Sequence, residues 1–217
     1  MQTGKVDTTA VIYPCAKLGK GVVVEPLCII GLADRFHDEL PCVIGQNSFI
    51  GSRSTIYCGV VSGDNLDISD QTTIFYDNQF GNNCRIGPKA VIKNGCRFGD
   101  NIRLNALVFL ERVDMGSNIF VGPGTVFTDD FHPPCPKYLD CAKKTRVESY
   151  VSVGANVTIA PGITIGHHSQ IYAGAVVIED VEPYSVVAGN PAQRIKDFRK
   201  LVCKPGHYSR PFEWWDE

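Results

Sequence analysis

One periodicity limits what this chain can fold into: an apolar residue returns at every sixth position over most of its length. The longest phase runs from Ile44 to Leu110 and contains one polar exception, Ser62. After a slip of one residue and one interruption, the series continues through Met115, Val121, Phe127, Val147, Val153, Ile159, Ile165, Ile171 and Val177. A period of six fits neither an α-helical stripe nor a coiled-coil heptad. Strands of about six residues that turn after every repeat wind into a three-sided solenoid with about 18 residues per coil.

Two further positions of the repeat are restricted. Glycine often follows the apolar residue, as at Gly45, Gly51 and Gly87. We expect this glycine to supply backbone freedom where each strand turns a corner. Small or β-branched residues occupy the fourth position after the apolar one, as in Ser48, Ser54, Thr72, Cys84, Ala90, Cys96, Thr125, Val157 and Ala175. An ordinary β-sandwich would alternate with a period of two, so the six-residue phase argues against it.

The repeat is interrupted by residues 32–41 and 128–146, and it stops before the C-terminal tail. Loops of this length without regular structure are usually functional. We therefore expect a solenoid domain over residues 1–195 with two excursion loops. A C-terminal cap over residues 196–217, beginning with a short helix in DFRKLV, is expected to lie across the open end of the solenoid.

Charge, hydrophobicity and cysteine content limit the classes of partner and the cellular compartment that fit this chain. Lysine and arginine number 21 against 23 acidic residues, so no positive excess is available to track a nucleic acid backbone. No stretch reaches the roughly 18 apolar residues that span a bilayer, and the N-terminus has no signal-peptide pattern, so we predict a cytoplasmic protein without membrane insertion. The nine cysteines are an odd number and mostly stand singly within repeats, which favours reduced thiols.

The pattern [LIVF]-G-x-x-small-x resembles that of the hexapeptide-repeat acyltransferases, whose core is a left-handed parallel β-helix. The left-handed winding is implied by this resemblance alone, since general rules favour right-handed crossovers. The segments FVGPGTVFTDD, SVGANVTIAPGITIG and AGAVVIEDVEPYSVVAGNPAQRI resemble bacterial N-acetyltransferases that modify nucleotide-linked amino sugars for surface polysaccharides such as lipopolysaccharide O-antigen. The likeness covers residues 44–195.

This resemblance implies an acetyl-CoA-dependent N-acetyltransferase that acts on a UDP- or dTDP-linked amino sugar. It also implies a homotrimer with active sites between subunits. Small residues would then contact the pantetheine arm and two basic residues would meet the phosphates of the cosubstrate. The positions implied for these contacts are Gly154, Ala155, Ala173, Gly174, Arg194 and Lys196.

Amide formation needs an unprotonated amine and a donor near the thioester oxygen. His132 is the first candidate base, because it follows FVGPGTVFTDD, near the place where similar enzymes assemble their site. Asp129 is expected to orient that imidazole or bind the sugar, although a solvated turn would also explain it. Asn105 is expected to hold the acceptor or the thioester carbonyl, with a plain surface role as the alternative. His37 is a second candidate base.

His132, Cys135 and Cys141 fall within ten positions, and Cys203 follows in the tail. Together they offer four soft ligands for a tetrahedral structural zinc ion. The spacing H-x2-C-x5-C is not a strong paired CxxC pattern, so unligated thiols remain an alternative. The zinc hypothesis competes with the base hypothesis, because a metal-bound imidazole cannot accept a proton.

Three other functions fit the same scaffold. Transfer to a sugar hydroxyl would use the same cosubstrate, and a non-catalytic trimeric scaffold would use none. A carbonic anhydrase of this fold needs three converging histidines on zinc, whereas the repeats carry only the adjacent His167 and His168.

Overall fold

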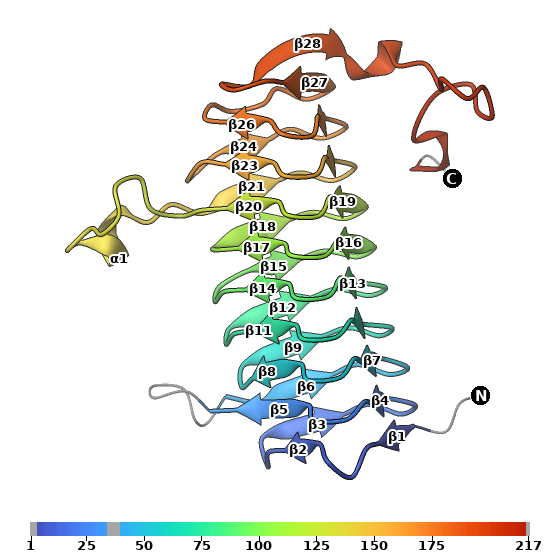
Figure 1. The fold of residues 1–217 in the computed structure, drawn as a ribbon, viewed down its shortest axis with the longest axis vertical. Coiled ribbons are helices and arrows are strands. Elements are labelled where there is room, and N and C mark those ends of the chain that lie inside the picture. Colours follow the sequence, from blue (N-terminus) through green and yellow to red (C-terminus); the bar gives the residue numbers. More distant parts are fainter. Residues whose placement is uncertain (1–3, 34–39, 216–217) are drawn as a thin grey trace.

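The computed structural model describes residues 4–33 and 40–215, so His37 lies outside the described residues. The chain winds into a three-sided prism in which short parallel strands stack along the long axis (Figure 1). The expectation of an all-β solenoid is confirmed. None of the helices in the described ranges combines the length and apolar character needed to cross a bilayer.

Each side of the prism is one sheet, here named A, B and C. Sheet A contains β1 (Lys5–Val6), β4 (Val23–Val24), β7 (Phe49–Ile50), β10 (Asp67–Ile68), β13 (Arg85–Ile86), β16 (Ile102–Leu104), β19 (Ile119–Val121), β22 (Ser152–Val153), β25 (Gln170–Ile171), β27 (Ser185–Ala188) and β28 (Gln193–Asp197). Sheet B contains β2 (Val11–Ile12), β5 (Ile29–Leu32), β8 (Thr55–Tyr57), β11 (Thr73–Ile74), β14 (Val91–Ile92), β17 (Phe109–Leu110), β20 (Val126–Phe127), β23 (Thr158–Ile159) and β26 (Val176–Val177). Sheet C contains β3 (Ala16–Leu18), β6 (Cys42–Ile44), β9 (Val60–Ser62), β12 (Asn78–Phe80), β15 (Arg97–Phe98), β18 (Val113–Met115), β21 (Thr145–Val147) and β24 (Thr164–Ile165).

The six-residue apolar series forms the core. Ile50, Ile68 and Ile86 pair in register on successive coils of sheet A and are buried inside the prism. Burying one such side chain contributes about 1.5–3 kcal/mol. The small residues of the repeat also point inward, and burial raises the pKa of Cys84 to about 11 and of Cys96 to about 12. These cysteines are therefore core thiols.

The expected role of the repeat glycines is wrong. Gly45 has no left-handed backbone, but a Cβ added to it would lie 2.0 Å from the carbonyl oxygen of Gly63 on the next coil. Glycine is required there because neighbouring coils approach closely, not because the corner needs flexibility. The left-handed conformation falls two residues later, on Asn47 and Asn65, with φ values of 54° and 59°. Asparagine tolerates this conformation better than most residues.

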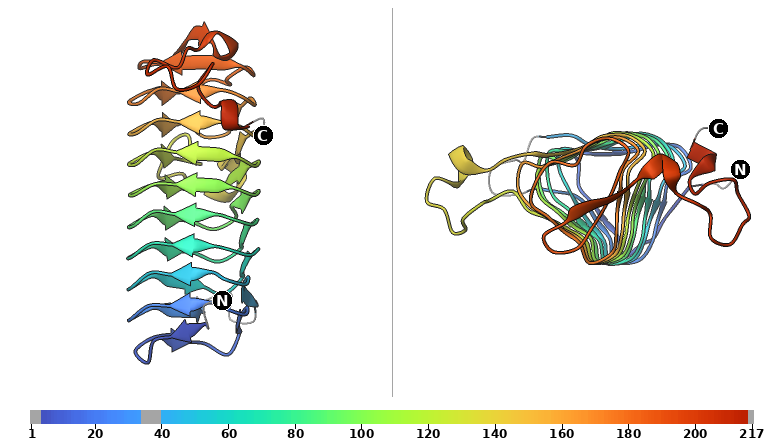
Figure 2. Two further views of the ribbon diagram at one scale, coloured as in Figure 1. Left: turned by 90° about the vertical axis from the view of Figure 1, so that its right-hand side faces the viewer. Right: turned by 90° about the horizontal axis from the view of Figure 1, so that it is seen from above.

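Among the residues that the structure describes, coil length varies only at the edge where sheet B turns into sheet C. Two segments are longer than a regular corner: an insertion separates β5 from β6, and residues 128–144 leave the prism between β20 and β21. Two corners are shorter than the others at this edge: residues 111–112, by one residue, and residues 178–180. The second loop thus ends at 144 rather than 146, because β21 already begins at Thr145. It carries the short helix α1 (Tyr138–Cys141), which projects from the prism (Figure 2).

The C-terminal segment differs from the expected cap. β28 pairs antiparallel with β27 and runs across position 196, so no boundary separates the tail from the solenoid there. The helix expected in DFRKLV is a single 3₁₀ turn, Phe198–Lys200. The chain then doubles back along the outside of the prism instead of covering only its end, and a second turn, Glu213–Trp215, follows (Figure 1).

Candidate functional site

A buried carboxylate lies at the B–C edge, directly after β20. Asp129 is 2% exposed, and the hydroxyl of Tyr138 from α1 donates a hydrogen bond of 2.5 Å to its Oδ2. Nε of Arg112 lies 3.4 Å from the same oxygen, and the Arg112 guanidinium lies 5.7 Å from the centre of the Tyr138 ring. Burial excludes the interpretation of Asp129 as part of a solvated turn.

Glu111 forms a carboxyl pair with Asp129. It follows β17 on the preceding coil and is only partly covered. Burial raises the pKa of Glu111, and so do the charge of Asp129 and a hydrogen bond between the two carboxyl groups. Burial and the Asp129 carboxylate likewise raise the pKa of Tyr138 to about 12. The pair therefore holds a proton more readily than two separate surface carboxylates would.

The local fold that assembles this pair is the short corner at Glu111 and Arg112. Phe98 pairs with Met115 at a separation of 17 residues, whereas 18 residues separate Phe80 from Phe98. Arg112 takes a left-handed backbone with φ of 45°, which closes the tighter turn. The corner therefore directs two charged side chains toward the loop of the next coil.

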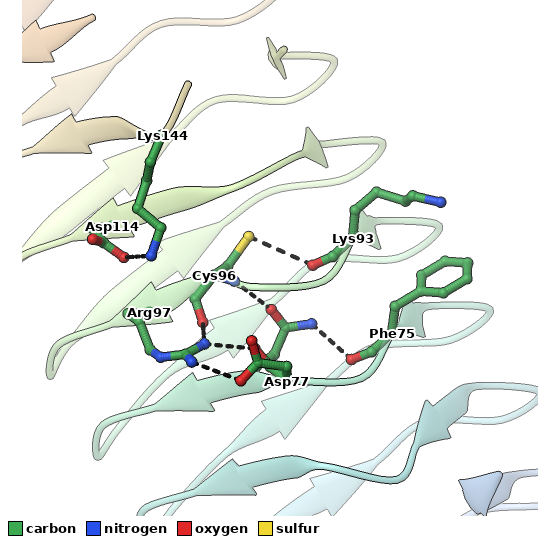
Figure 3. Close-up of polar contacts among 8 residues, drawn as sticks. Phe75, Asp77, Lys93, Cys96, Arg97, Asp114 and Lys144 are labelled. Carbon is green, nitrogen blue, oxygen red and sulfur yellow. Dashed lines mark hydrogen bonds and ion pairs between the residues drawn. The ribbon is translucent and has the colours of Figure 1, made fainter. Parts of the chain in front are cut away.

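Polar contacts anchor the base of the loop on sheet C. Nζ of Lys144 lies 2.7 Å from Oδ1 of Asp114 in β18 (Figure 3). One coil below, Arg97 and Asp77 form a second ion pair of 2.6 Å at the same edge. The Lys144–Asp114 ion pair thus fixes the point at which the loop rejoins the prism.

The predicted base His132 is not part of the carboxyl pair. Its side chain is 65% exposed, and its Nδ1 lies 3.9 Å from Oδ1 of Asp130. Asn105 lies at the opposite end of sheet B, between β16 and β17, where its Nδ2 donates to the carbonyl of Val121 at 3.1 Å. The three predicted catalytic residues are therefore not brought together within one chain.

The positions expected to contact pantetheine lie at the A–B edge. A Cβ on Gly154 would lie 2.5 Å from the backbone nitrogen of Ala173, so coil packing alone requires glycine at this position. Ala173 and Gly174 are exposed, Ala155 is half-buried, and no atom lies within 4 Å of a Cβ placed on Gly174. This edge is open and lined by small residues.

The positions expected to meet phosphates lie on β28. Arg194 borders a hollow of about 200 Å³ together with Glu179, Asp180 and Glu182, and its Nη2 is 3.8 Å from Asp197. These carboxylates disfavour a phosphate beside Arg194. Lys196 is exposed and does not border the hollow.

The expected soft-ligand group is found in part. Ligand atoms of His132, Cys135 and Cys141 lie within 4.8 Å of one another. Cys203 does not belong to this cluster, because the tail runs on the side of the prism opposite α1 (Figure 2). The fourth ligand proposed from the sequence is therefore wrong for a single chain.

Sequence reasoning missed a hollow between the tail and sheet A. It has a volume of about 440 Å³, and aromatic and polar side chains line it, among them Arg103, Phe120, Phe212 and Trp215. Arg103 also borders a neighbouring hollow of about 230 Å³ that contains Asn105. The two hollows share Arg103, and the smaller one lies at the A–B edge.

Comparisons with known proteins agree with the repeat pattern and the fold. The family model for bacterial transferase hexapeptide repeats matches residues 144–179, and that for the hexapeptide repeat of succinyl-transferase matches residues 41–69. The structure of Francisella novicida UDP-N-acetylglucosamine acyltransferase superposes with a TM-score of 0.58 at 20% identity, covering 89% of this chain and 70% of that one. The fold is therefore that of hexapeptide-repeat β-helix proteins, and two segments of the chain match models of hexapeptide-repeat transferases.

Two curated relatives match shorter segments. The 2,3,4,5-tetrahydropyridine-2,6-dicarboxylate N-acetyltransferase of Bacillus licheniformis is 38% identical over 86 residues, which cover 40% of this chain and 34% of that protein. A chloramphenicol acetyltransferase of Klebsiella aerogenes is 36% identical over 75 residues, or 35% of each chain. The chain spans about a third of the length of the curated relatives it matches.

Proposed function

We propose that this protein is an acyltransferase that moves an acetyl group from acetyl-CoA to the amine of a nucleotide-linked amino sugar. The observation that carries the proposal is the Glu111–Asp129 carboxyl pair. Glu111 is partly exposed and has a raised pKa, and it contacts the buried Asp129. A carboxylate with a raised pKa is a stronger proton acceptor than an ordinary surface carboxylate.

The chemistry follows from the charges. An amino sugar arrives largely as an ammonium ion, whose positive charge the carboxyl pair attracts. A sugar hydroxyl is neutral and would not be attracted in this way. Glu111 takes one proton from the ammonium ion and passes it to solvent, and the free amine then attacks the thioester carbonyl. A second N–H proton moves to Glu111 as the C–N bond forms, the C–S bond breaks, and coenzyme A leaves as a thiol that carries this second proton. Asp129 holds Glu111 in place and keeps its pKa raised.

The donor and acceptor contacts extend the proposal beyond one chain. The open A–B edge at Ala155, Ala173 and Gly174 suits a pantetheine arm, and the second amide hydrogen of Asn105 suits the thioester oxygen. This edge and the carboxyl pair lie at opposite ends of sheet B, so a neighbouring copy would complete the site. Phe131 and Leu139, which are 58% and 78% exposed on the loop, are suited to contact that copy in a homotrimer.

The acceptor class rests on two kinds of support. One relative is named as an N-acetyltransferase, and one solved structure of the same fold is named as an acyltransferase of UDP-N-acetylglucosamine. The 440 Å³ hollow adds aromatic faces for a base and an arginine for a diphosphate. Such substrates occur in the cytoplasm and supply surface polysaccharides.

Mass spectrometry tests the proposal most directly. Purified protein is incubated with acetyl-CoA and a panel of UDP- and dTDP-linked amino sugars, each paired with its hydroxyl analogue. We expect one added acetyl group on an amino sugar and none on its analogue. Modification of the hydroxyl analogue alone would establish O-acetylation. No product, together with no saturable thermal stabilisation by acetyl-CoA, would indicate a scaffold.

A further inference from the structure

The loop of residues 128–144 lacks the buried apolar side chains and strand pairing that order the coils of the prism. Its helix α1 has no buried residue and no side-chain cap at its N-terminus. Its apolar residues Phe131 and Leu139 are exposed. Segments too small to bury a core are usually held by a disulfide, a metal ion or a partner. Yet this loop must deliver the hydroxyl of Tyr138 to Asp129.

Three soft ligands meet within this loop. His132 comes before α1, and Cys135 and Cys141 lie on either side of Tyr138. Their ligand atoms all lie within 4.8 Å of one another. Zinc–sulfur bonds of about 2.3 Å at tetrahedral angles place two sulfur atoms about 3.8 Å apart, so closure needs shifts of about 1 Å.

We propose that His132, Cys135 and Cys141 bind one Zn²⁺ ion. Two thiols and an imidazole select zinc over magnesium or calcium, which prefer oxygen ligands. Binding replaces the two thiol protons, which are released to solvent, and a water molecule fills the fourth tetrahedral position.

Asp130 supports the first of these ligands. Its Oδ1 accepts a hydrogen bond of 3.0 Å from the backbone N–H of His132 and lies 3.9 Å from the imidazole Nδ1. Carboxylates beside metal-ligating histidines commonly orient the ring. The Asp130 side chain is itself only 11% exposed, so it gives the ligand a fixed neighbour.

The zinc ion closes a ring of ten residues with Tyr138 inside it. The ion thereby holds the tyrosine hydroxyl on Asp129 without any apolar burial. It also removes His132 from the list of bases, because a metal-bound nitrogen has no lone pair for a proton. Metal binding is independent of the proposed acetyl transfer, since it is measured without any substrate.

Metal titration of the full chain tests the site. Reduced protein is stripped of metal, and Co²⁺ is added as an optical probe before displacement by Zn²⁺. We expect one ion per chain, with the absorption of a tetrahedral thiolate complex. Cys135→Ser, Cys141→Ser and His132→Ala should each weaken binding at least 10-fold, an effect typical of a lost metal contact. The matched control Cys203→Ser, which removes a tail thiol, should bind as the parent does.

Two results would overturn the proposal. One is binding that is equal in the parent and in Cys135→Ser, or that Cys203→Ser abolishes. The other is protein purified without metal under reducing conditions that still contains a Cys135–Cys141 disulfide. Hydrogen exchange provides a second readout, because zinc should slow exchange in residues 128–144 and leave the prism strands unchanged. Circular dichroism of every variant should be unaltered, since the loop contributes nothing to the core.

Discussion

The coils of the prism and the loop of residues 128–144 are ordered by different means. A coil is fixed by stacking identical positions, so that Ile50, Ile68 and Ile86 bury one another and each inner strand is paired on both sides. The loop has no buried helix residue and is fixed by a few contacts to Asp129 and Asp114. Changes to the coils should therefore affect stability, and changes to the loop should affect chemistry.

The largest expected effect concerns the carboxyl pair. Glu111→Gln should lower kcat/KM by about 100- to 10,000-fold, the usual contribution of a positioned base. Steady-state kinetics with the identified acceptor measures the loss. Asp140→Asn, which removes an exposed carboxylate from α1, is the matched control and should retain activity. Full activity in Glu111→Gln would rule out the proposed base.

A core truncation tests the coil side of the comparison. Ile68→Ala should lower the free energy of unfolding by about 2–5 kcal/mol, because Ile68 is fully buried and leaves a cavity. Lys137→Ala, at an exposed position of the loop, should change it by no more than about 0.5 kcal/mol. Urea denaturation followed by circular dichroism gives both values. Equal losses in the two variants would contradict the distinction drawn here.

The short corner can be lengthened to sharpen the comparison. Inserting one glycine between Glu111 and Arg112 restores the coil length of 18 residues found below it. We expect the prism to fold, because other corners of this edge differ in length, while kcat/KM falls about 10-fold or more from a misplaced carboxyl. Thermal melting and kinetics are measured on the same sample. Unchanged kinetics would mean that the tight corner has no part in the chemistry.

Removal of the tyrosine hydroxyl should have a smaller effect. Tyr138→Phe loses a hydrogen bond to a charged group, worth about 1.5–3 kcal/mol, and kcat/KM should fall by about 10- to 100-fold. The matched variant Tyr13→Phe removes an exposed phenol that follows β2, outside both the carboxyl cluster and the proposed pantetheine edge. A drop in the control as large as in Tyr138→Phe would point to a general packing effect.

The smallest effect is a shift along the pH axis. Because the pKa of Glu111 is raised, kcat/KM should rise with pH through a value above the ordinary glutamate pKa of about 4.3. Asp129→Asn removes the neighbouring charge, so this rise should move to lower pH. For stability the sign is opposite: the folded state binds more protons, so the unfolding free energy falls as pH rises through this window. Glu111→Gln should abolish that decline in urea denaturation across the same pH range.

The fold was predictable because the pattern that defines each strand and corner lies within a single hexapeptide. The apolar residue of every hexapeptide points inward wherever the strand lies, so period six alone defines three sheets. The slip between Leu110 and Met115 was also visible in the sequence and is confirmed by the pairing of Phe98 with Met115. The role of Gly45 was misjudged, because contact between coils involves residues 18 positions apart and leaves no local signal.

The site was predictable only in part. Asp129 and the His132–Cys135–Cys141 group are close in sequence, and their spacing indicated that they matter. Glu111, Arg112 and Tyr138 were missed, because stacking of coils and folding of the loop bring them to Asp129. The one-residue slip of the repeat at Glu111 and Arg112 was the signal that marks their corner. In the sequence this slip indicates only a change in strand register, not a functional site.

All changes of coil length described above fall on the B–C edge, and this has a practical consequence for protein engineering. Natural insertions and deletions at this margin leave the strand pairing of all three faces intact, so foreign peptides should be tolerated there as well. The corner at Asn94 and Gly95, which has the regular length, is a suitable graft point for an epitope or a fluorescent label. The A–B and C–A edges, whose corners keep a constant length, would not be altered by such an insertion.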